Sequence, residues 1–429
     1  MSKFVIQIEG EAMLLNKVIF TKRPVIESHK KFATLKSVVS RVGRIDTYLR
    51  IATSLLIGLM MNAFIPVNAN AADHIKVTRE FFLENNAVKA ITRTHDGGYV
   101  IAGYSTATRV DTSGKVIWRY ASKKLKSDFH SVTTLPDDSV ILCGESEAEK
   151  TPGHGLRTFG LLTRVDKTGT VVSDNLISPN DNQNHSLNSL NRCFPFEDGV
   201  AILGNTSAPV WGNPGFDWLV MLDDKGIQKS EKLSHDIGFE KILTMSDHSF
   251  VTHTHTALAG SFIANRVSRV DSSSTVKATR IISDWSFPVQ AVVGDRAIRL
   301  LTGDRMGIKS LEILNDKLET SNQTKLSVDL IAPIRAYALP DRSMMLFGSE
   351  ASGNNSSTAS MEWISPDLAH NESYIFEPRY SSEICDVIPT GTQGEFVVVR
   401  RVWPFHNFLN VFGAEEKREG IVLTFVQVK

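Results

Sequence analysis

The sequence predicts an all-β fold from three observations. An apolar strand, a short polar turn and a second apolar strand recur along most of the chain, first as AITRTHDGGYVIAGY from Ala90. Each such half-unit is followed by a second one, first ATRVDTSGKVIW, so that four strands repeat every 40 to 60 residues or so. The third observation is that the last unit lacks a fourth strand, whereas one unassigned strand precedes the first unit. Four-stranded units in this rhythm are typical of β-propeller blades, and the count predicts one propeller of seven blades.

The first half-units carry turns that suit tight hairpins, because Asp and Gly tolerate the positive φ such turns need. The seven first half-units begin at Ala90, Val132, Cys193, Ile242, Ala291, Ala336 and Val387. Six of them turn at Asp96-Gly97-Gly98, Asp137-Asp138, Asp198-Gly199, Asp247-His248, Gly294-Asp295 and Asp341-Arg342.

The second half-units are again strand, turn and strand, and their turns are marked by a short polar side chain. These turns lie at Asp111, Asp166, Asp223, Asp271, Asn315 and Pro366-Asp367.

The ends of the repeat predict how the ring closes. The seventh unit has a third strand, GIVLTFVQV, which ends before Lys429, and no fourth. An unassigned strand, IKVTREFFLE, precedes the first unit. It can complete the last blade and so remove the free sheet edges that invite aggregation. Residues 72–429 are therefore predicted to form the propeller.

The segment before the propeller resembles a secretory leader. Residues 51–67 are apolar, Arg41, Arg44 and Arg50 precede them, and Ala69-Asn70-Ala71 follows. This pattern predicts a signal peptide over residues 51–71, after an extension and positive region over residues 1–50. Cleavage near Ala71 would leave a periplasmic or extracellular protein. The alternative is an uncleaved anchor, in which residues 51–67 provide the only membrane contact.

Composition excludes some partners and leaves others open. Lys plus Arg and Asp plus Glu both number 47, so the basic face expected of a nucleic-acid-binding protein is not indicated. The three cysteines, Cys143, Cys193 and Cys385, form no metal-binding spacing and no disulfide framework. We expect them to be small buried residues in strands. One pair could oxidise, but the sequence does not say which.

The segments HDGGYVIAGYS, FDWLVMLDDKG and RVDTSGKVIWRY resemble the repeats of secreted bacterial β-propellers, which are loosely related to the pyrroloquinoline-quinone-like repeat propellers. The likeness is sharp in the first blade and fades toward the last. Only Trp118 occupies the tryptophan position that ends the repeat. The resemblance implies fold and export. It supplies no catalytic residue and gives no support for a quinone, so no cofactor is expected.

Loops between the second and third strands should gather at one end of the ring, where propellers often bind ligands. Three of these loops are long and two of them are rich in aromatics, which commonly anchor protein or glycan interfaces. The alternative is that the aromatics fold back over their own blades. Trp218 begins a strand and is predicted to be structural. The aromatic-rich loops supply Trp211, Phe216, Trp403, Phe405 and His406 as predicted binding residues.

Connections between blades carry acidic residues beside histidine or tryptophan. They could bind a cation or perform acid–base chemistry, or they could simply cap strand ends. The pairs are Asp128 with His130, Asp181 with His185, His235 with Asp236, and Asp284 with Trp285. His253 and His255 share one strand face but lack an identifiable third ligand, so a packed polar pair is favoured and no metal site is predicted.

The sequence thus favours an exported, non-enzymatic binding module that acts as a monomer on another protein or a glycan, for example as an inhibitor, an immunity protein or an envelope scaffold. The alternative is an extracytoplasmic hydrolase or lyase with its site at the channel mouth. No catalytic residue can be assigned. A cluster of three or more of Asp128, His185, His235, Asp236 and Asp284 would favour the enzyme.

Overall fold

A computed structural model gives the structure of the chain, which divides into two units, Met1–Asn68 and Ala69–Lys429. In the first unit, β1 (Gln7–Ile8) and β2 (Glu11–Ala12) pair antiparallel. The described residues are 7–8, 11–12, 73–84, 88–124, 126–147, 157–180, 187–207, 215–238, 240–245, 247–258, 262–282, 290–293, 298–304, 307–328, 330, 335–352, 356–376, 380–404 and 420–429. Every regular element among them is a strand, and none is a helix able to span a membrane.

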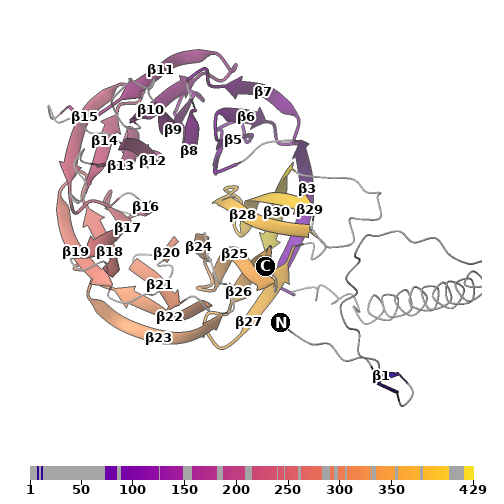
Figure 1. The fold of residues 1–429 in the computed structure, drawn as a ribbon. Coiled ribbons are helices and arrows are strands. Elements are labelled where there is room, and N and C mark those ends of the chain that lie inside the picture. Colours follow the sequence, from indigo (N-terminus) through magenta and orange to yellow (C-terminus); the bar gives the residue numbers. More distant parts are fainter. Residues whose placement is uncertain are drawn as a thin grey trace, which may run out of the picture. The chain divides into compact units, whose positions relative to one another are not determined.

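The second unit is a β-propeller of seven four-stranded antiparallel blades arranged in a ring, as predicted (Figure 1). The first three blades are β4 (Ala90–Arg93), β5 (Tyr99–Gly103), β6 (Thr106–Val110) and β7 (Val116–Ala121); β8 (Asp128–Thr134), β9 (Val140–Glu147), β10 (Thr158–Val165) and β11 (Val171–Ile177); and β12 (Leu187–Phe196), β13 (Gly199–Ser207), β14 (Phe216–Leu222) and β15 (Gln228–Ser234).

The remaining blades repeat the same order from the innermost strand outward. They are β16 (Glu240–Thr244), β17 (Phe250–Leu258), β18 (Phe262–Val270) and β19 (Val276–Ile282); β20 (Gln290–Val293), β21 (Ile298–Asp304), β22 (Gly307–Leu314) and β23 (Thr320–Val328); β24 (Arg335–Ala338), β25 (Met344–Ser352), β26 (Ser356–Ile364) and β27 (Asn371–Ile375); and β28 (Tyr380–Pro389), β29 (Glu395–Pro404), β30 (Gly420–Val428) and β3 (Ile75–Glu84). The fifth and sixth blades also join through parallel pairing of β20 with β24.

The hydrophobic core lies between the blades. The described residues form seven clusters of buried apolar side chains, and each cluster combines residues from two adjoining blades around the whole ring. Middle strands are covered on both faces, so every residue of β5 is buried. The outermost strand β7 instead alternates, and it turns Trp118 and Tyr120 inward. A blade therefore depends on both neighbours for its burial.

The ring closes through the N-terminal strand, as the sequence predicts. β3 pairs antiparallel with β30, from Ile75 opposite Val428 to Glu84 opposite Gly420. Arg400, fully buried in β29, donates hydrogen bonds to Glu80 of β3 and to Thr424 of β30. One buried guanidinium thus fastens the closing strand to the blade that it completes.

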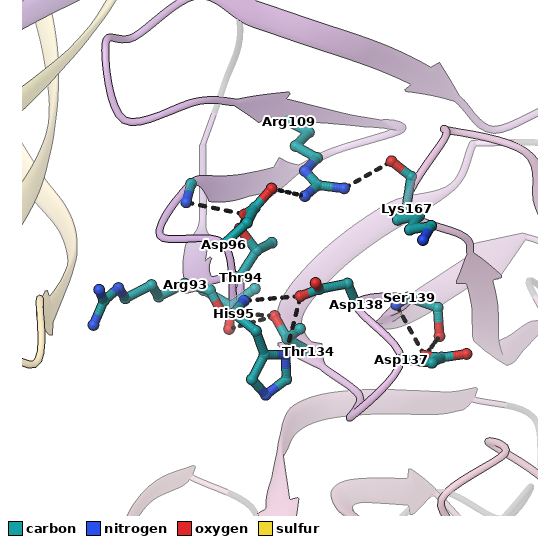
Figure 2. Close-up of polar contacts among 12 residues, drawn as sticks. Arg93, Thr94, His95, Asp96, Arg109, Thr134, Asp137, Asp138, Ser139 and Lys167 are labelled. Atoms are coloured by element: carbon teal, nitrogen blue, oxygen red, sulfur yellow. Dashed lines mark hydrogen bonds and ion pairs between the residues drawn. The ribbon is translucent and has the colours of Figure 1, made fainter.

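A second set of contacts joins successive blades at one end of the ring. This end carries the turns between the first and second strands and between the third and fourth strands of each blade, most of which contain aspartate and are called the Asp turns here. Arg109 of β6 donates to Asp96 in its own blade at 2.6 Å and to the Lys167 carbonyl of the next blade at 2.7 Å (Figure 2). Asp138 of the second blade accepts a hydrogen bond from the His95 backbone. Two further arginines in the equivalent position make the same pair of contacts: Arg164 with Asp137 and the Lys225 carbonyl, and Arg269 with Asp247 and the Asp316 carbonyl.

The tryptophan that ends the repeat has a packing role. Gly169, in the outer turn of the second blade, has φ +93°, and an added Cβ there would lie 2.8 Å from Cγ of Trp118 in the first blade. Trp118 Nε1 also donates to the Lys167 carbonyl at 3.2 Å. Phe81 lies against Gly114 in the same way across the seventh and first blades. The glycine of the turn therefore leaves room for an aromatic ring from the preceding blade.

Cys143 and Cys193 are buried in β9 and β12, as predicted, whereas Cys385 in β28 is partly buried; all three are free thiols. Burial raises the pKa of the Cys143 thiol, and the neighbouring Cys193 raises it further. Burial also raises the pKa of Cys385 to about 12. Thiols this hard to ionise are poor nucleophiles near neutral pH.

The Asp turns predict acid sensitivity. Asp166 accepts hydrogen bonds from the Thr168 hydroxyl and the Thr170 backbone, and these bonds lower the pKa of its carboxyl. The same direction holds for the pKa of the other turn aspartates, Asp111, Asp223, Asp271 and Asp367. A carboxyl whose pKa is lower in the folded than in the unfolded chain contributes stability at every pH above its unfolded pKa, which is near 4. This contribution is lost as pH falls through the folded pKa. We expect the urea midpoint to fall between about pH 5 and pH 3.

Asp166→Asn removes the charge of one turn and keeps its backbone hydrogen bonds. Asn315, at the same position in the fifth blade, already accepts hydrogen bonds from the backbone two and four residues further on, as Asp166 does. The variant should be less stable than the parent at pH 7. That difference should shrink as pH falls below the unfolded pKa and vanish below the lower folded pKa, where the Asp166 carboxyl is protonated in both the folded and the unfolded chain. A difference that does not change with pH would show that the Asp166 charge contributes nothing.

Candidate functional site

The innermost strands of the ring all begin at the same end, because each blade starts at its inner strand and alternates direction outward. This end, called the channel mouth here, carries the start of β8 at Asp128, the start of β12 at Leu187 and the β5–β6 turn at Tyr104. The Asp turns lie at the opposite end. The long loops singled out in the sequence connect strands at the channel mouth, and their central residues lie outside the described part.

Three innermost strands carry a β-bulge at the same place. The register shifts between Phe129 and Ser131 in β8, between Leu190 and Arg192 in β12, and between Ile384 and Asp386 in β28. The extra residues are therefore His130, Asn191 and Cys385. Bulges redirect side chains and recur near functional sites.

Two of these bulged residues, His130 and Asn191, belong to a polar network across the first three blades. Lys89 Nζ lies 2.5 Å from Asp128 Oδ2, and His130 Nε2 lies 3.5 Å from the same oxygen. His130 Nδ1 is 3.3 Å from Ser189 Oγ. The network continues from Ser189 to Asn191 Oδ1 at 2.9 Å, and from Asn191 Nδ2 to Asn205 Oδ1 at 2.7 Å.

Asp128 is the charged centre of this network. Burial raises the pKa of its carboxyl, but hydrogen bonds from His130 and Lys89 outweigh burial and leave the pKa below the usual value. Glu145 of β9 is paired directly opposite Asp128. Ligand atoms of Asp128, His130 and Glu145 lie within 4.8 Å of one another, and all three residues are half-buried. The site is a cluster of two carboxylates with one imidazole and one ammonium.

Deeper in the channel, a buried carboxylate links several blades. Asp386 of β28 lies 2.7 Å from Arg335 Nη2 of the sixth blade and 3.8 Å from Arg192 Nη2 of the third. It also accepts a hydrogen bond from the Ile91 backbone in the first blade. The attraction of Asp386 outweighs burial and raises the pKa of Arg335. Arg192 therefore reaches from one side of the ring toward the other.

A second group lies between the third and fourth blades. The rings of Phe216 and His235 stack with centroids 4.3 Å apart. Exposed Asp236 lies 3.7 Å from Arg266 Nη1, whose Nη2 is 2.7 Å from Asp217. Burial raises the pKa of the Asp217 carboxyl. Phe216, His235 and Asp236 are thus brought together, and Arg266 joins them through Asp236.

The other predicted residues are distributed as follows. Trp403, partly buried at the end of β29, has the Arg401 guanidinium 5.6 Å from its ring. Trp218 is fully buried, as predicted, and His253 is buried in β17, whereas the side chain of His255 is outside the described part. Six predicted binding residues lie outside the described residues: Trp211, Phe405, His406, His185, Asp284 and Trp285.

Sequence reasoning paired Asp128 with His130 but missed the other members of the channel site. Lys89 immediately precedes β4, Glu145 and Ser189 lie in β9 and β12, and Arg192, Arg335 and Asp386 come from three different blades. One signal was available for the last three, since each is a charged residue in a predicted innermost strand. A charged residue in such a strand has to face the channel or a buried partner.

Comparison with known proteins identifies the fold of the chain and does not identify a family or an activity. No family model matches the chain, and no curated protein matches its sequence. Among solved structures, a chain of the mitotic checkpoint complex is 11% identical with a TM-score of 0.51, over 82% of this chain and 92% of that one. Raptor of Chaetomium thermophilum is 10% identical with a TM-score of 0.51, over 84% of this chain and 30% of Raptor. At these identities the likeness defines the class as a β-propeller protein.

Proposed function

We propose that this protein is an exported propeller that binds another protein through the channel mouth. The observation that carries the proposal is Tyr104, whose side chain is 50% exposed at the β5–β6 turn. Its φ of +42° is uncommon for a residue other than glycine, and the Tyr104 carbonyl accepts a 2.6 Å hydrogen bond from the Phe129 backbone. A half-exposed aromatic ring on a backbone that is held in place loses little entropy on binding.

The surroundings of Tyr104 support a protein partner. Lys89 Nζ lies 5.4 Å from the centre of the ring, and Leu187, 42% exposed, begins the innermost strand of the third blade at the same mouth. Apolar anchors beside charged groups are the usual make-up of protein interfaces. One of the two similar solved structures is itself a chain of a protein complex.

The double variant Tyr104→Ala/Leu187→Ala is expected to weaken binding of the partner by tenfold or more, since buried aromatic anchors dominate interface energy. The full chain would be purified with a C-terminal tag from the extracytoplasmic fraction. Co-purifying proteins and the N-terminus would be identified by mass spectrometry. Export with cleavage predicts an N-terminus at Ala72.

The matched control is Ile117→Ala/Ile227→Ala, which removes two apolar side chains that are 51% and 62% exposed but lie away from the channel mouth. It should retain the partner. A partner lost only from the control would place the interface elsewhere. A clean monomer from both parent and variants would overturn the stable-complex proposal, and binding on a glycan array would replace the protein partner by a glycan.

The rival function is an extracytoplasmic hydrolase or lyase, favoured by the grouping of Asp128, His130 and Glu145 at the channel mouth. Carboxylates beside an imidazole can transfer protons to and from a bound substrate. A panel of glycan and phosphoester substrates tests this function. Activity that disappears in Glu145→Gln and persists in Tyr104→Ala would favour the enzyme over the binding module.

A further inference from the structure

We infer that Asp128, His130 and Glu145 form a binding site for a divalent transition metal of the zinc class. Imidazole nitrogen with two carboxylates is a donor set that zinc accepts, leaving at least one coordination position open. The ligand atoms of the three residues lie within 4.8 Å of one another, so modest side-chain rotation brings all three onto one ion. The inference does not depend on the proposed partner.

The backbone holds these ligands rigidly. Asp128 and Glu145 are opposite residues of the paired strands β8 and β9, and His130 occupies the bulge of β8. Ligands on paired strands are placed more precisely than ligands on loops. The bulge brings the imidazole toward the carboxylates, and His130 Nε2 lies 3.5 Å from Asp128 Oδ2.

The neighbouring hydrogen bonds set the imidazole tautomer. Asn191 donates its amide to Asn205, so its own oxygen accepts the Ser189 hydroxyl proton. Ser189 Oγ then has only lone pairs for His130 and accepts from Nδ1–H. This leaves Nε2, which lies 3.5 Å from Asp128 Oδ2, as the nitrogen that can offer its lone pair to a metal in place of its hydrogen bond to Asp128. A metal-binding histidine needs this arrangement, with its other nitrogen donating to an outer oxygen.

A second observation points to a cation as the ligand of this site. Asp128 Oδ1 and the adjacent Ser127 Oγ are both buried and have no hydrogen-bond partner among the residues that the structure describes. Buried acceptors in native proteins are nearly always satisfied, and an unsatisfied one calls for a water or an ion. A metal on Asp128 Oδ1 would satisfy the carboxylate oxygen that no donor among the described residues reaches.

Lys89 is the competitor of the metal. Its ammonium lies 2.5 Å from Asp128 Oδ2 and already compensates the carboxylate charge. A metal ion and the Lys89 ammonium would repel each other on the Asp128 carboxylate, so Lys89 lowers the affinity of the site for the metal. Replacing it by methionine keeps most of the side-chain volume and removes the charge.

The test uses the full purified chain, stripped with a chelator and titrated with Zn²⁺ alone by calorimetry. Co²⁺ titration followed by visible absorption reports the coordination geometry. We expect one ion per chain. His130→Ala and Glu145→Gln should weaken binding by tenfold or more, and Ser189→Ala by about tenfold, as is usual for outer-shell partners. Lys89→Met should bind Zn²⁺ more tightly than the parent.

His95→Ala is the matched control, since His95 Nδ1 lies 3.0 Å from the single carboxylate of Asp138 at the opposite end of the blades. It should leave the Zn²⁺ affinity unchanged. The gain in Lys89→Met separates a metal site from a purely structural ion pair, because misfolding cannot tighten binding. Affinity that is equal in parent and His130→Ala, or weaker in Lys89→Met, would overturn the inference.

Discussion

Replacing Trp218 by alanine is expected to lower the free energy of unfolding by about 3 to 5 kcal/mol, the range for deleting a buried large aromatic side chain. Trp218 is fully buried in the cluster between the second and third blades, and its Nε1 donates to Glu231 at 3.2 Å. Gly160 of the second blade packs so closely that an added Cβ would lie 3.1 Å from the indole. The indole of Trp218 thus fills the space between the second and third blades. Its loss leaves a cavity that neither blade can close alone.

The experiment is urea unfolding of parent and variant, followed by circular dichroism. Trp403→Ala is the control, because that indole is only partly buried at the end of β29, and it should cost less than about 1 kcal/mol. Equal losses in the two variants would contradict the assignment of Trp218 to the core. Binding data on Trp403→Ala then test its predicted interface role without a change in stability.

Removing residues 73–84 is expected to abolish the cooperative unfolding transition of the propeller. β30 would lose its outer partner along its whole length, and the buried Arg400 would lose Glu80, 2.6 Å away. Arg400 is fully buried although Glu80 is exposed, so removing Glu80 leaves a buried guanidinium without this carboxylate and destabilises the ring further.

A chain that begins at Ala72 is the control and should unfold like the propeller of the full chain, because it retains β3. The deletion variant should also recover its transition when a synthetic peptide of residues 73–84 is supplied. Thermal melts and limited proteolysis report both effects. A deletion variant with the same midpoint as the control would show that the ring is stable without its closing strand.

The sequence was sufficient for the fold because a propeller repeats its local signals. Each Asp turn marks a hairpin on its own, and the unmatched strands IKVTREFFLE and GIVLTFVQV define the closure before any contact is known. The fading of the motif in later blades did not matter. Strand spacing persists even where turns carry Ser274, Leu318 or Leu368 at positive φ in place of glycine.

The site was harder to predict because it depends on register and on distant strands. Asp128 and His130 are neighbours in sequence, but Glu145 meets them only through the β8–β9 pairing. The bulge that redirects His130 has no residue type that marks it. Asp386 and Arg192 belong to blades on different sides of the ring, and only the closed ring brings them together. Pseudo-symmetry predicts which positions face the channel, but not which of their side chains meet.

The closure also imposes an order on synthesis. Glu80 and Thr424, which are hydrogen-bonded in the ring, are 344 residues apart in the chain. β3 is among the first strands of the ring to be made and has its partner only when the last one is complete. Until then it presents an open, partly apolar edge that can pair with other chains. Contacts of such sequence separation form slowly. We therefore expect newly made chains to depend on chaperones that shield strand edges, and we expect yields to fall steeply with protein concentration during refolding.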